Sequence, residues 1–242
     1  DLPELVYPER LNAVKTVFEH ARENGWMDRV VYYCNGFEYT FEQLETSVGK
    51  TMVALVSAGV GRGDVVILRI PDTIDLVITL LAVQAIGAVA MPTYVQLRAD
   101  DLVYRANDAD ARLLISTPNL LQEALPVADS RDGATKVMAL NVDPEGRCRG
   151  LQEFMPEERV LPEFADMDAE ELCLFLYTSG STGAPKGAIH CHRDMLAICD
   201  TYWRHCIAPE PNDVLSGPPS IAFALGFGMF VYFPLRLGHA AV

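Results

Sequence analysis

Residues 177 to 187 read Tyr-Thr-Ser-Gly-Ser-Thr-Gly-Ala-Pro-Lys-Gly, and their types and spacing suit the binding of an anion. Hydroxyl side chains and backbone N–H groups can donate hydrogen bonds, and Lys186 adds a positive charge. Glycines adopt positive φ readily, so successive N–H groups can line a concavity around a phosphate. The apolar run 172–177 leads into the loop and predicts a buried strand. A strand that opens into such a loop indicates a polyphosphate site.

The two most common nucleotide-binding loops do not fit this run. A Walker A loop reads G-x-x-x-x-G-K-[ST]. Pro185 stands where its second glycine belongs, and Gly187 stands where Ser or Thr must follow the lysine. A dinucleotide-binding turn reads G-x-G-x-x-G. Residues 59–63 follow a helical pattern instead, and Gly226-Phe227-Gly228 lacks the third glycine.

The composition limits the partners of this chain. Its 242 residues suffice for one large or two small domains, and half of them are hydrophobic, so a substantial core is expected. The net charge of −14 argues against nucleic acid and against an anionic membrane surface, because both need basic patches. An anionic substrate such as ATP must therefore meet a local positive site.

Several features favour a cytoplasmic protein without a membrane segment. The longest apolar stretches, 76–91 and 221–235, are shorter than a bilayer span, and the first residues lack the pattern of a signal peptide. The six cysteines form no C-x-x-C pair and fit a reducing compartment. Packing on one helix is a stronger interpretation than a metal site for the cluster His190, Cys191, His192, Cys199, His205 and Cys206.

Strand and helix patterns alternate along the chain. This alternation predicts an α/β fold with parallel sheets flanked by helices. Apolar periodicity predicts helices at 8–24, 40–59, 72–86, 100–107, 119–125 and 193–206. Short apolar runs predict strands at 30–34, 37–40, 65–70, 88–91, 112–116, 136–140, 172–177 and 213–216. Asn35-Gly36 predicts a hairpin turn, and Thr40 with Gln43 predicts a helix-capping box.

The loop at 177–187 resembles the phosphate-loop signature of adenylate-forming enzymes, the AMP-binding superfamily of acyl-CoA synthetases, peptide-synthetase adenylation domains and beetle luciferases. Eleven positions fit without a gap. A solvated Ser/Gly linker is the alternative, but such linkers rarely carry Pro-Lys-Gly behind a buried strand. The likeness extends to the segments 39–44, 61–66, 85–92 and 186–192.

The segment 220–228 is most similar to benzoate- and 2-aminobenzoate-CoA ligases, in which it forms one wall of the acid pocket. By position, the resemblance implies that the substrate pocket is lined by Phe223, Ala224, Leu225 and Gly226. Some benzoate ligases have Tyr where this chain has Leu225, which leaves the size and substituents of the ring open. An ordinary core helix is the alternative, because apolar residues alone do not define a pocket.

The resemblance also implies a domain organisation. Residues 1–171 match a first α/β subdomain that ends in an acidic connection, and residues 172–242 match the phosphate loop and the start of a second subdomain. The family's later motifs and its C-terminal domain are absent from this sequence. We therefore expect a portion of a longer enzyme, which binds nucleotide weakly or not at all and completes no turnover alone.

The resemblance implies two half-reactions. A small-molecule carboxylic acid attacks the α-phosphate of ATP, and CoA then displaces AMP from the acyl-adenylate, with Mg²⁺ as cofactor. The cradle for ATP would comprise Thr178, Ser179, Gly180, Ser181, Thr182, Gly183 and Lys186. The catalytic set would be Lys186, Thr182 and His192, although a structural hydrogen bond is an equal alternative for His192, and His190 is expected to pack locally.

Two alternatives remain open at this point. The acceptor could be a carrier-protein thiol, or the adenylate could be oxidised, because acceptor specificity would lie largely outside this sequence. The acid could be aliphatic instead of aromatic. No nucleic acid or membrane partner is expected, and the sequence leaves the oligomeric state open.

Overall fold

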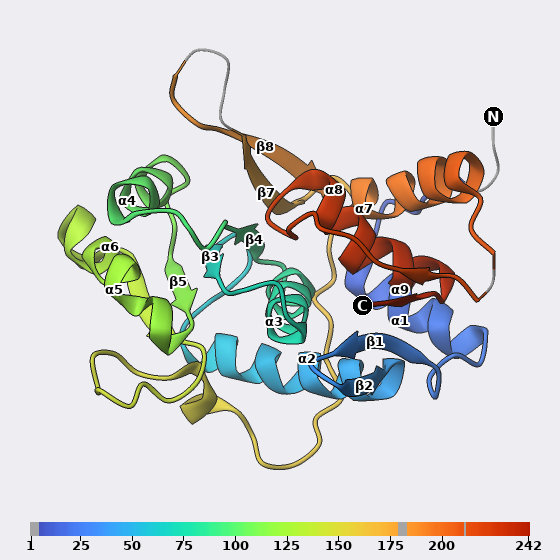
Figure 1. The fold of residues 1–242 in the computed structure, drawn as a ribbon, viewed down its shortest axis with the longest axis horizontal. Coiled ribbons are helices and arrows are strands. Elements are labelled where there is room, and N and C mark those ends of the chain that lie inside the picture. The colour runs from blue at the N-terminus through green and yellow to red at the C-terminus, as the bar shows by residue number, and fades with distance from the viewer. Residues whose placement is uncertain (1–4, 179–182, 211) are drawn as a thin grey trace.

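The computed structural model describes residues 5–178, 183–210 and 212–242, which form two β-sheets with helices packed around them (Figure 1). The larger sheet has six strands in the order β6 (Lys136–Ala139), β5 (Leu113–Ser116), β3 (Val65–Arg69), β4 (Val89–Pro92), β7 (Leu172–Thr178) and β8 (Lys186–Cys191). The smaller sheet has the order β2 (Phe37–Thr40), β1 (Val30–Cys34), β10 (Ala240–Ala241) and β9 (Val214–Leu215).

The helices differ in length and type. The α-helices are α1 (Ala13–Glu23), α2 (Phe41–Ser57), α3 (Ile74–Ala85), α4 (Ala99–Asp108), α5 (Leu121–Ala124), α6 (Pro126–Asp129), α7 (His192–Ile198), α8 (Ala224–Phe227) and α9 (Phe233–Leu237). Short 3₁₀ turns are η2 (Pro118–Leu120), η3 (Ser130–Gly133) and η4 (Leu151–Phe154). Two wider π-helical segments, η5 (Cys199–Ile207) and η6 (Gly228–Tyr232), continue α7 and α8.

Five neighbouring strands of the larger sheet run parallel, from β6 to β7, and β8 returns antiparallel to β7 as a hairpin. Every residue of β3, β4 and β5 is buried, as expected for strands covered by helices on both faces. The predicted class, an α/β fold with parallel sheets flanked by helices, is confirmed.

Local signals in the sequence predicted several details correctly. Asn35 and Gly36 both have positive φ, at 52° and 80°, and connect β1 to β2 as a tight turn. The Thr40 side chain accepts from the Gln43 N–H at 3.3 Å, and the Gln43 side chain accepts from the Thr40 N–H at 2.9 Å. This reciprocal pair is the predicted capping box, and it begins α2 at Phe41.

The first predicted helix begins later than its apolar spacing suggests. Asn12 has extended backbone, and its side chain accepts from the N–H groups of Val14 and Lys15, so the helix begins at Ala13. The residues before it are held elsewhere, since Leu11 N–H donates to the Met167 carbonyl at 2.9 Å. The predicted helix at 193–206 also changes, because it widens from α7 into the π-helical η5 at Cys199.

The sheets join chain segments from both sides of residue 171. Strand β7 pairs with β4, and β10 lies between β1 and β9. In this structure, both sheets therefore contain strands from before and after the predicted boundary at 171/172. The division into two subdomains stays a prediction about a longer protein. Buried hydrogen bonds also connect residues from both sides of residue 171. The Tyr232 hydroxyl donates to the Gln84 side-chain oxygen at 2.8 Å, and the Gln84 side-chain nitrogen donates to the Cys173 carbonyl at 3.2 Å.

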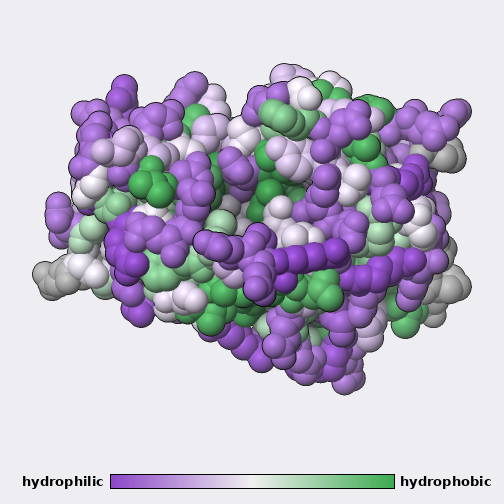
Figure 2. Space-filling model, turned by 90° about the horizontal axis from the view of Figure 1, so that it is seen from below, coloured by the Kyte–Doolittle hydropathy of each residue, from purple (hydrophilic) through white to green (hydrophobic). Residues whose placement is uncertain are grey.

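Polar side chains dominate the face of the molecule in Figure 2, where apolar residues appear only in scattered groups. Across the described residues, no helix combines the length and hydropathy that a bilayer crossing requires.

Candidate functional site

The β7–β8 hairpin carries the ends of the predicted phosphate loop. Cross-strand partners of an antiparallel pair point to the same face of the sheet. The register pairs Thr178 with Lys186, Leu176 with Ala188, and Leu174 with His190. Thr178, Lys186 and His190 therefore follow one another along a single face of the hairpin, together with the apolar side chains of β7. We call this surface the front face of the hairpin.

The loop itself is described only at its ends. Ser179, Gly180, Ser181 and Thr182 lie outside the described residues, so their predicted contacts with phosphate stay predictions. Thr178 and Lys186 are both exposed, and the Thr178 hydroxyl donates to the Lys186 carbonyl at 3.5 Å. Gly183 has a φ of 111°, a conformation that side-chain-bearing residues rarely adopt. The ends of the loop thus hold a lysine and a hydroxyl next to each other in solvent.

A cavity of about 560 Å³ adjoins the front face, and we call it the hairpin pocket. Its walls come from β7, β8, α7, η5, α8, η6 and α9. It is lined by Leu174, Leu176, His190, Asp194, Met195, Ala197, Ile198, Thr201, Tyr202, Ala224, Leu225, Phe227, Gly228 and Phe233. The lining is mostly apolar, with one ionisable pair, since His190 Nδ1 lies 3.7 Å from Asp194 Oδ2. Such a cavity suits an apolar group of the size of an aromatic ring.

Two of the four predicted substrate residues reach the hairpin pocket. Ala224 and Leu225 line it. Phe223 points elsewhere, with its ring centroid 5.7 Å from that of Tyr94, and Gly226 is on the buried side of α8. Phe223 is 49% exposed and Leu225 59% exposed, which is not the packing of an ordinary core helix.

Gly226 is required by a close approach of two backbone segments. A Cβ atom at this position would lie 2.1 Å from the Ser220 carbonyl oxygen and 2.7 Å from that of Pro219. Only glycine lets α8 pack this tightly against the preceding turn. Gly226 therefore shapes the segment and is not among the residues that line the hairpin pocket, and its predicted contact with substrate stays a prediction, as does that of Phe223.

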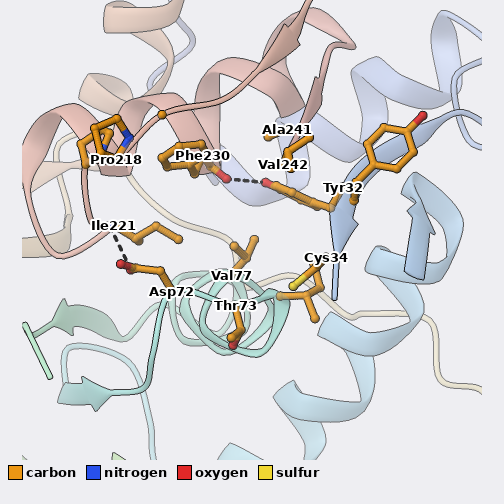
Figure 3. Close-up of a pocket in the computed structure, with 14 residues that line it drawn as sticks. Tyr32, Cys34, Asp72, Thr73, Val77, Pro218, Ile221, Phe230, Ala241 and Val242 are labelled. Carbon is orange, nitrogen blue, oxygen red and sulfur yellow. Dashed lines mark hydrogen bonds between the residues drawn. The ribbon is translucent and has the colours of Figure 1, made fainter. Parts of the chain in front are cut away.

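A second, smaller cavity lies behind the segment 217–230 (Figure 3). Across it, Asp72 Oδ1 accepts from the Ile221 N–H at 3.0 Å (Figure 3). The same oxygen accepts from the Ser220 hydroxyl at 3.1 Å. The Tyr32 hydroxyl donates to the Phe230 carbonyl at 2.8 Å. These bonds fix the segment from behind, so that Ala224 and Leu225 face the hairpin pocket. No sequence signal pairs Asp72 with a residue 148 positions away, and the sequence analysis missed it.

His192 lies away from the pocket. Its side chain is fully buried, and Nδ1 accepts a hydrogen bond from the Ala13 N–H at 3.2 Å, so it holds the start of α1. Burial lowers the pKa of His192 to about 4. Among the described residues, its Nε2 has no hydrogen-bond partner. This geometry favours the structural alternative for His192, and its catalytic role stays a prediction. His190, expected to pack locally, is the histidine that lines the pocket.

The histidines and cysteines of 190–206 do not converge. His190 faces the hairpin pocket, whereas Cys199 is buried, with its thiol 3.1 Å from the Met195 carbonyl. In the part of the chain that the structure describes, no three His, Cys, Asp or Glu side chains come together as metal ligands would.

Comparison with known proteins identifies the family. A family model described as "AMP-binding enzyme" matches residues 18–242. The p-hydroxybenzoic acid–AMP ligase FadD22 of Mycobacterium marinum is 31% identical over 232 residues, which are 96% of this chain and 30% of that protein. The benzoate–CoA ligase of Thauera aromatica is 28% identical over 241 residues, which are 99% of this chain and 45% of that protein.

Solved structures agree on the fold. The anthranilate CoA ligase AuaEII, solved in complex with anthranoyl-AMP, superimposes with a TM-score of 0.91 at 21% identity, over 100% of this chain and 46% of that one. A benzoate CoA ligase from Burkholderia xenovorans LB400 gives a TM-score of 0.84 at 21% identity, over 96% of this chain and 45% of that one. The chain thus spans less than half the length of these relatives. The resemblance to adenylate-forming enzymes is confirmed.

Replacing Gly226 tests the close approach between α8 and the backbone of Pro219 and Ser220. Gly226→Ala should lower the free energy of unfolding by about 2 kcal/mol, because the added Cβ must displace the backbone of Ser220. Urea unfolding measures this loss. The matched control is Gly61→Ala, where a Cβ would meet nothing nearer than Asp64 Oδ2 at 3.9 Å. Equal losses in the two variants would contradict the crowding.

Burial of His192 should make stability depend on pH. Because its pKa is lowered to about 4 in the folded chain, the unfolded chain takes up the proton first as pH falls. The free energy of unfolding therefore falls as pH drops below 6.5, the pKa of an unfolded histidine, and stops falling near pH 4. The loss from this residue is about 2 kcal/mol between pH 7.5 and pH 5. His192→Asn should remove this part of the pH dependence of urea unfolding.

The control is the unmutated chain, unfolded in the same series of buffers. If His192→Asn retains the full loss of stability at pH 5, other groups cause it.

Proposed function

Because this chain belongs to the family of AMP-binding enzymes, we propose that its parent protein activates a carboxylic acid with ATP, forming an acyl-adenylate and pyrophosphate. The chain supplies the phosphate loop and one wall of the acid pocket. We further propose that the 242-residue chain alone completes no turnover, because it spans less than half of its relatives.

One observation carries this proposal, the order of residues along the front face of the hairpin. Thr178 and Lys186 occupy the end next to the phosphate loop, and the hairpin pocket begins at Leu176 on the same face. An acid whose apolar group fills the pocket would direct its carboxylate along this face towards the loop. That arrangement brings the nucleophilic oxygen and the α-phosphate of ATP together.

In the reaction, a carboxylate oxygen forms a bond to the α-phosphorus, and the bond from that phosphorus to the bridging oxygen breaks to release pyrophosphate. Negative charge accumulates on the leaving pyrophosphate. Lys186 and the N–H and hydroxyl donors proposed for Thr178 to Gly183 would stabilise that charge, and none of them acts as nucleophile or base. The chemistry needed from this loop is thus electrostatic and positional.

The proposed site would take up Mg²⁺ together with ATP. The residues at the described ends of the loop, 178 and 183–186, include no carboxylate, so ATP phosphate oxygens would be the main ligands of the ion. When bound, Mg²⁺ would neutralise part of the charge on the β- and γ-phosphates.

We propose an aromatic acid such as benzoate or 2-aminobenzoate as the substrate. The apolar lining and the volume of about 560 Å³ support a ring. Relatives named for p-hydroxybenzoic acid, benzoate and anthranilate support the same class. The pair of His190 and Asp194 adds charge and hydrogen-bonding groups to the wall, where it would meet a polar ring substituent.

For the second step we propose CoA as the acceptor, as the names of several relatives state. A different acceptor remains a second candidate, because the name of FadD22 states only AMP ligation. A cytoplasmic location is also part of the proposal, since all six cysteines are unpaired thiols.

Removing the charge at Lys186 tests the phosphate site. In the protein at its natural length, Lys186→Ala should slow acid-dependent pyrophosphate release from ATP at least tenfold, or about 1.4 kcal/mol. Lys136→Ala, which removes an exposed lysine on β6, is the control and should leave the rate unchanged. Unaltered release by Lys186→Ala would refute the assignment.

A panel of acids tests the pocket. Pyrophosphate release should be faster with benzoate, 2-aminobenzoate or cinnamate than with octanoate. Leu225→Tyr should narrow the pocket and reduce the efficiency with cinnamate roughly tenfold more than with benzoate. Leu161→Tyr, at an exposed position outside the hairpin pocket, serves as control. Release only with octanoate would keep the reaction and reject the aromatic pocket.

A further inference from the structure

The opposite side of the hairpin, its back face, packs against α4. Side chains alternate between the two faces of a strand, so Phe175 and Tyr177 point away from the hairpin pocket. Both pack against a cluster of apolar side chains that includes Leu102 and Ala106 of α4. Residues immediately next to the phosphate loop thus contact a helix on the side away from the proposed substrate.

Tyr177 makes the closest of these contacts. Its hydroxyl donates to Asp108 Oδ2 at 2.6 Å, and the guanidinium of Arg105 lies 5.3 Å from the centroid of its ring. Burial and the hydrogen bond to Asp108 raise the pKa of Tyr177, so the hydroxyl keeps its proton and remains a donor. Its cross-strand partner is Gly187, where a Cβ would lie only 3.2 Å from the tyrosine ring. Glycine leaves room for the ring.

The residue that leads into β8 is bonded to the same helix. The Tyr104 hydroxyl donates to the Pro185 carbonyl at 3.1 Å. Tyr104 and Asp108 are four residues apart and therefore lie on one face of α4. One contact precedes Thr178 by one residue and the other precedes Lys186 by one residue. Helix α4 therefore makes a hydrogen bond next to each end of the phosphate loop.

Helix α4 is itself well fixed. Leu102 is fully buried, and the Glu123 carboxylate accepts from the Ala99 N–H at 2.9 Å at the first turn of the helix. The hairpin, in contrast, extends beyond the rest of the sheet (Figure 1), and Lys186 to Ile189 of the edge strand β8 are exposed. An edge strand has neighbours on one side only, so its direction depends on contacts with other elements.

We propose that Tyr104, Asp108 and Tyr177 form a hairpin anchor that positions the phosphate-binding loop for ATP. These are positioning residues, because they lie on the back face and act through Thr178 and Lys186. The inference rests on the proposed function, since it assumes that the loop binds ATP. It adds a requirement on α4, which the phosphate-loop signature does not contain.

The test uses conservative variants in the protein at its natural length. Tyr104→Phe and Tyr177→Phe remove one hydroxyl each and keep the packing of the ring. The double variant should raise the ATP concentration for half-maximal pyrophosphate release at least fivefold, while the value for the acid changes less than twofold. Asp108→Ala should behave like Tyr177→Phe, and Asp108→Asn, which keeps an acceptor oxygen, should recover most of the effect.

The matched control is Tyr7→Phe. The Tyr7 hydroxyl donates to Asp200 Oδ2 at 3.0 Å, so this variant removes a bond of the same kind between two residues that are not part of the hairpin or of α4. It should leave the dependence on ATP unchanged. If the double variant also leaves it unchanged, or if Tyr7→Phe shifts it equally, the anchor has no positioning role and the inference is wrong.

Hydrogen exchange separates this inference from the proposed function. Backbone amides of Lys186 to His190 should exchange at least fivefold faster in the double variant than in the wild type or in Tyr7→Phe. A wild type that releases no pyrophosphate with any acid would refute the proposed function. In that case, ATP should still slow exchange in the wild-type hairpin and fail to do so in the double variant. If ATP slows exchange equally in the wild type and the double variant, or in neither, the hairpin anchor is refuted.

Discussion

The antiparallel pairing of β7 with β8 is the interaction on which the candidate site depends. A strict alternation of side chains divides the hairpin into two faces with different tasks. One face carries Thr178, Lys186 and the wall of an apolar pocket, and the other carries Tyr177 against α4. A slip of one residue in this register would exchange the two faces and move Lys186 to the side of α4. The position of the phosphate loop and the shape of the pocket are therefore set by one ladder of backbone hydrogen bonds.

One wall of the hairpin pocket is held in place by polar contacts over long sequence distances. Asp72, just before α3, and Tyr32 on β1 hold the segment 220–230 from behind, and Gly226 lets it fold tightly on itself. Each of these groups shapes the pocket without lining it. The wall at Ala224 and Leu225 thus depends on residues outside the lining of the hairpin pocket.

Local chemistry explains which features could be predicted from the sequence. The Asn35-Gly36 turn and the Thr40–Gln43 box involve neighbouring residues, and the apolar run 65–68 indicates the buried strand β3, so these elements were predicted correctly. The start of α1 depends on the Asn12 cap, and apolar spacing alone does not reveal it. The roles of Asp72 and Tyr177 depend on partners 148 and 69 positions away, which only the folded chain brings together. Motif resemblance named the phosphate loop but not the helix that supports it.

The position of β10 has a consequence for the order in which the molecule forms. Strand β1 pairs through Tyr32 with Ala241, so its parallel partner is more than two hundred residues away. On a ribosome, β1 can pair with β2 early, but its other edge stays open until residue 241 has been made. Contacts between such distant residues close large loops and form slowly. The smaller sheet is therefore completed after the larger one, and during synthesis the edge of β1 stays open to pairing with other chains.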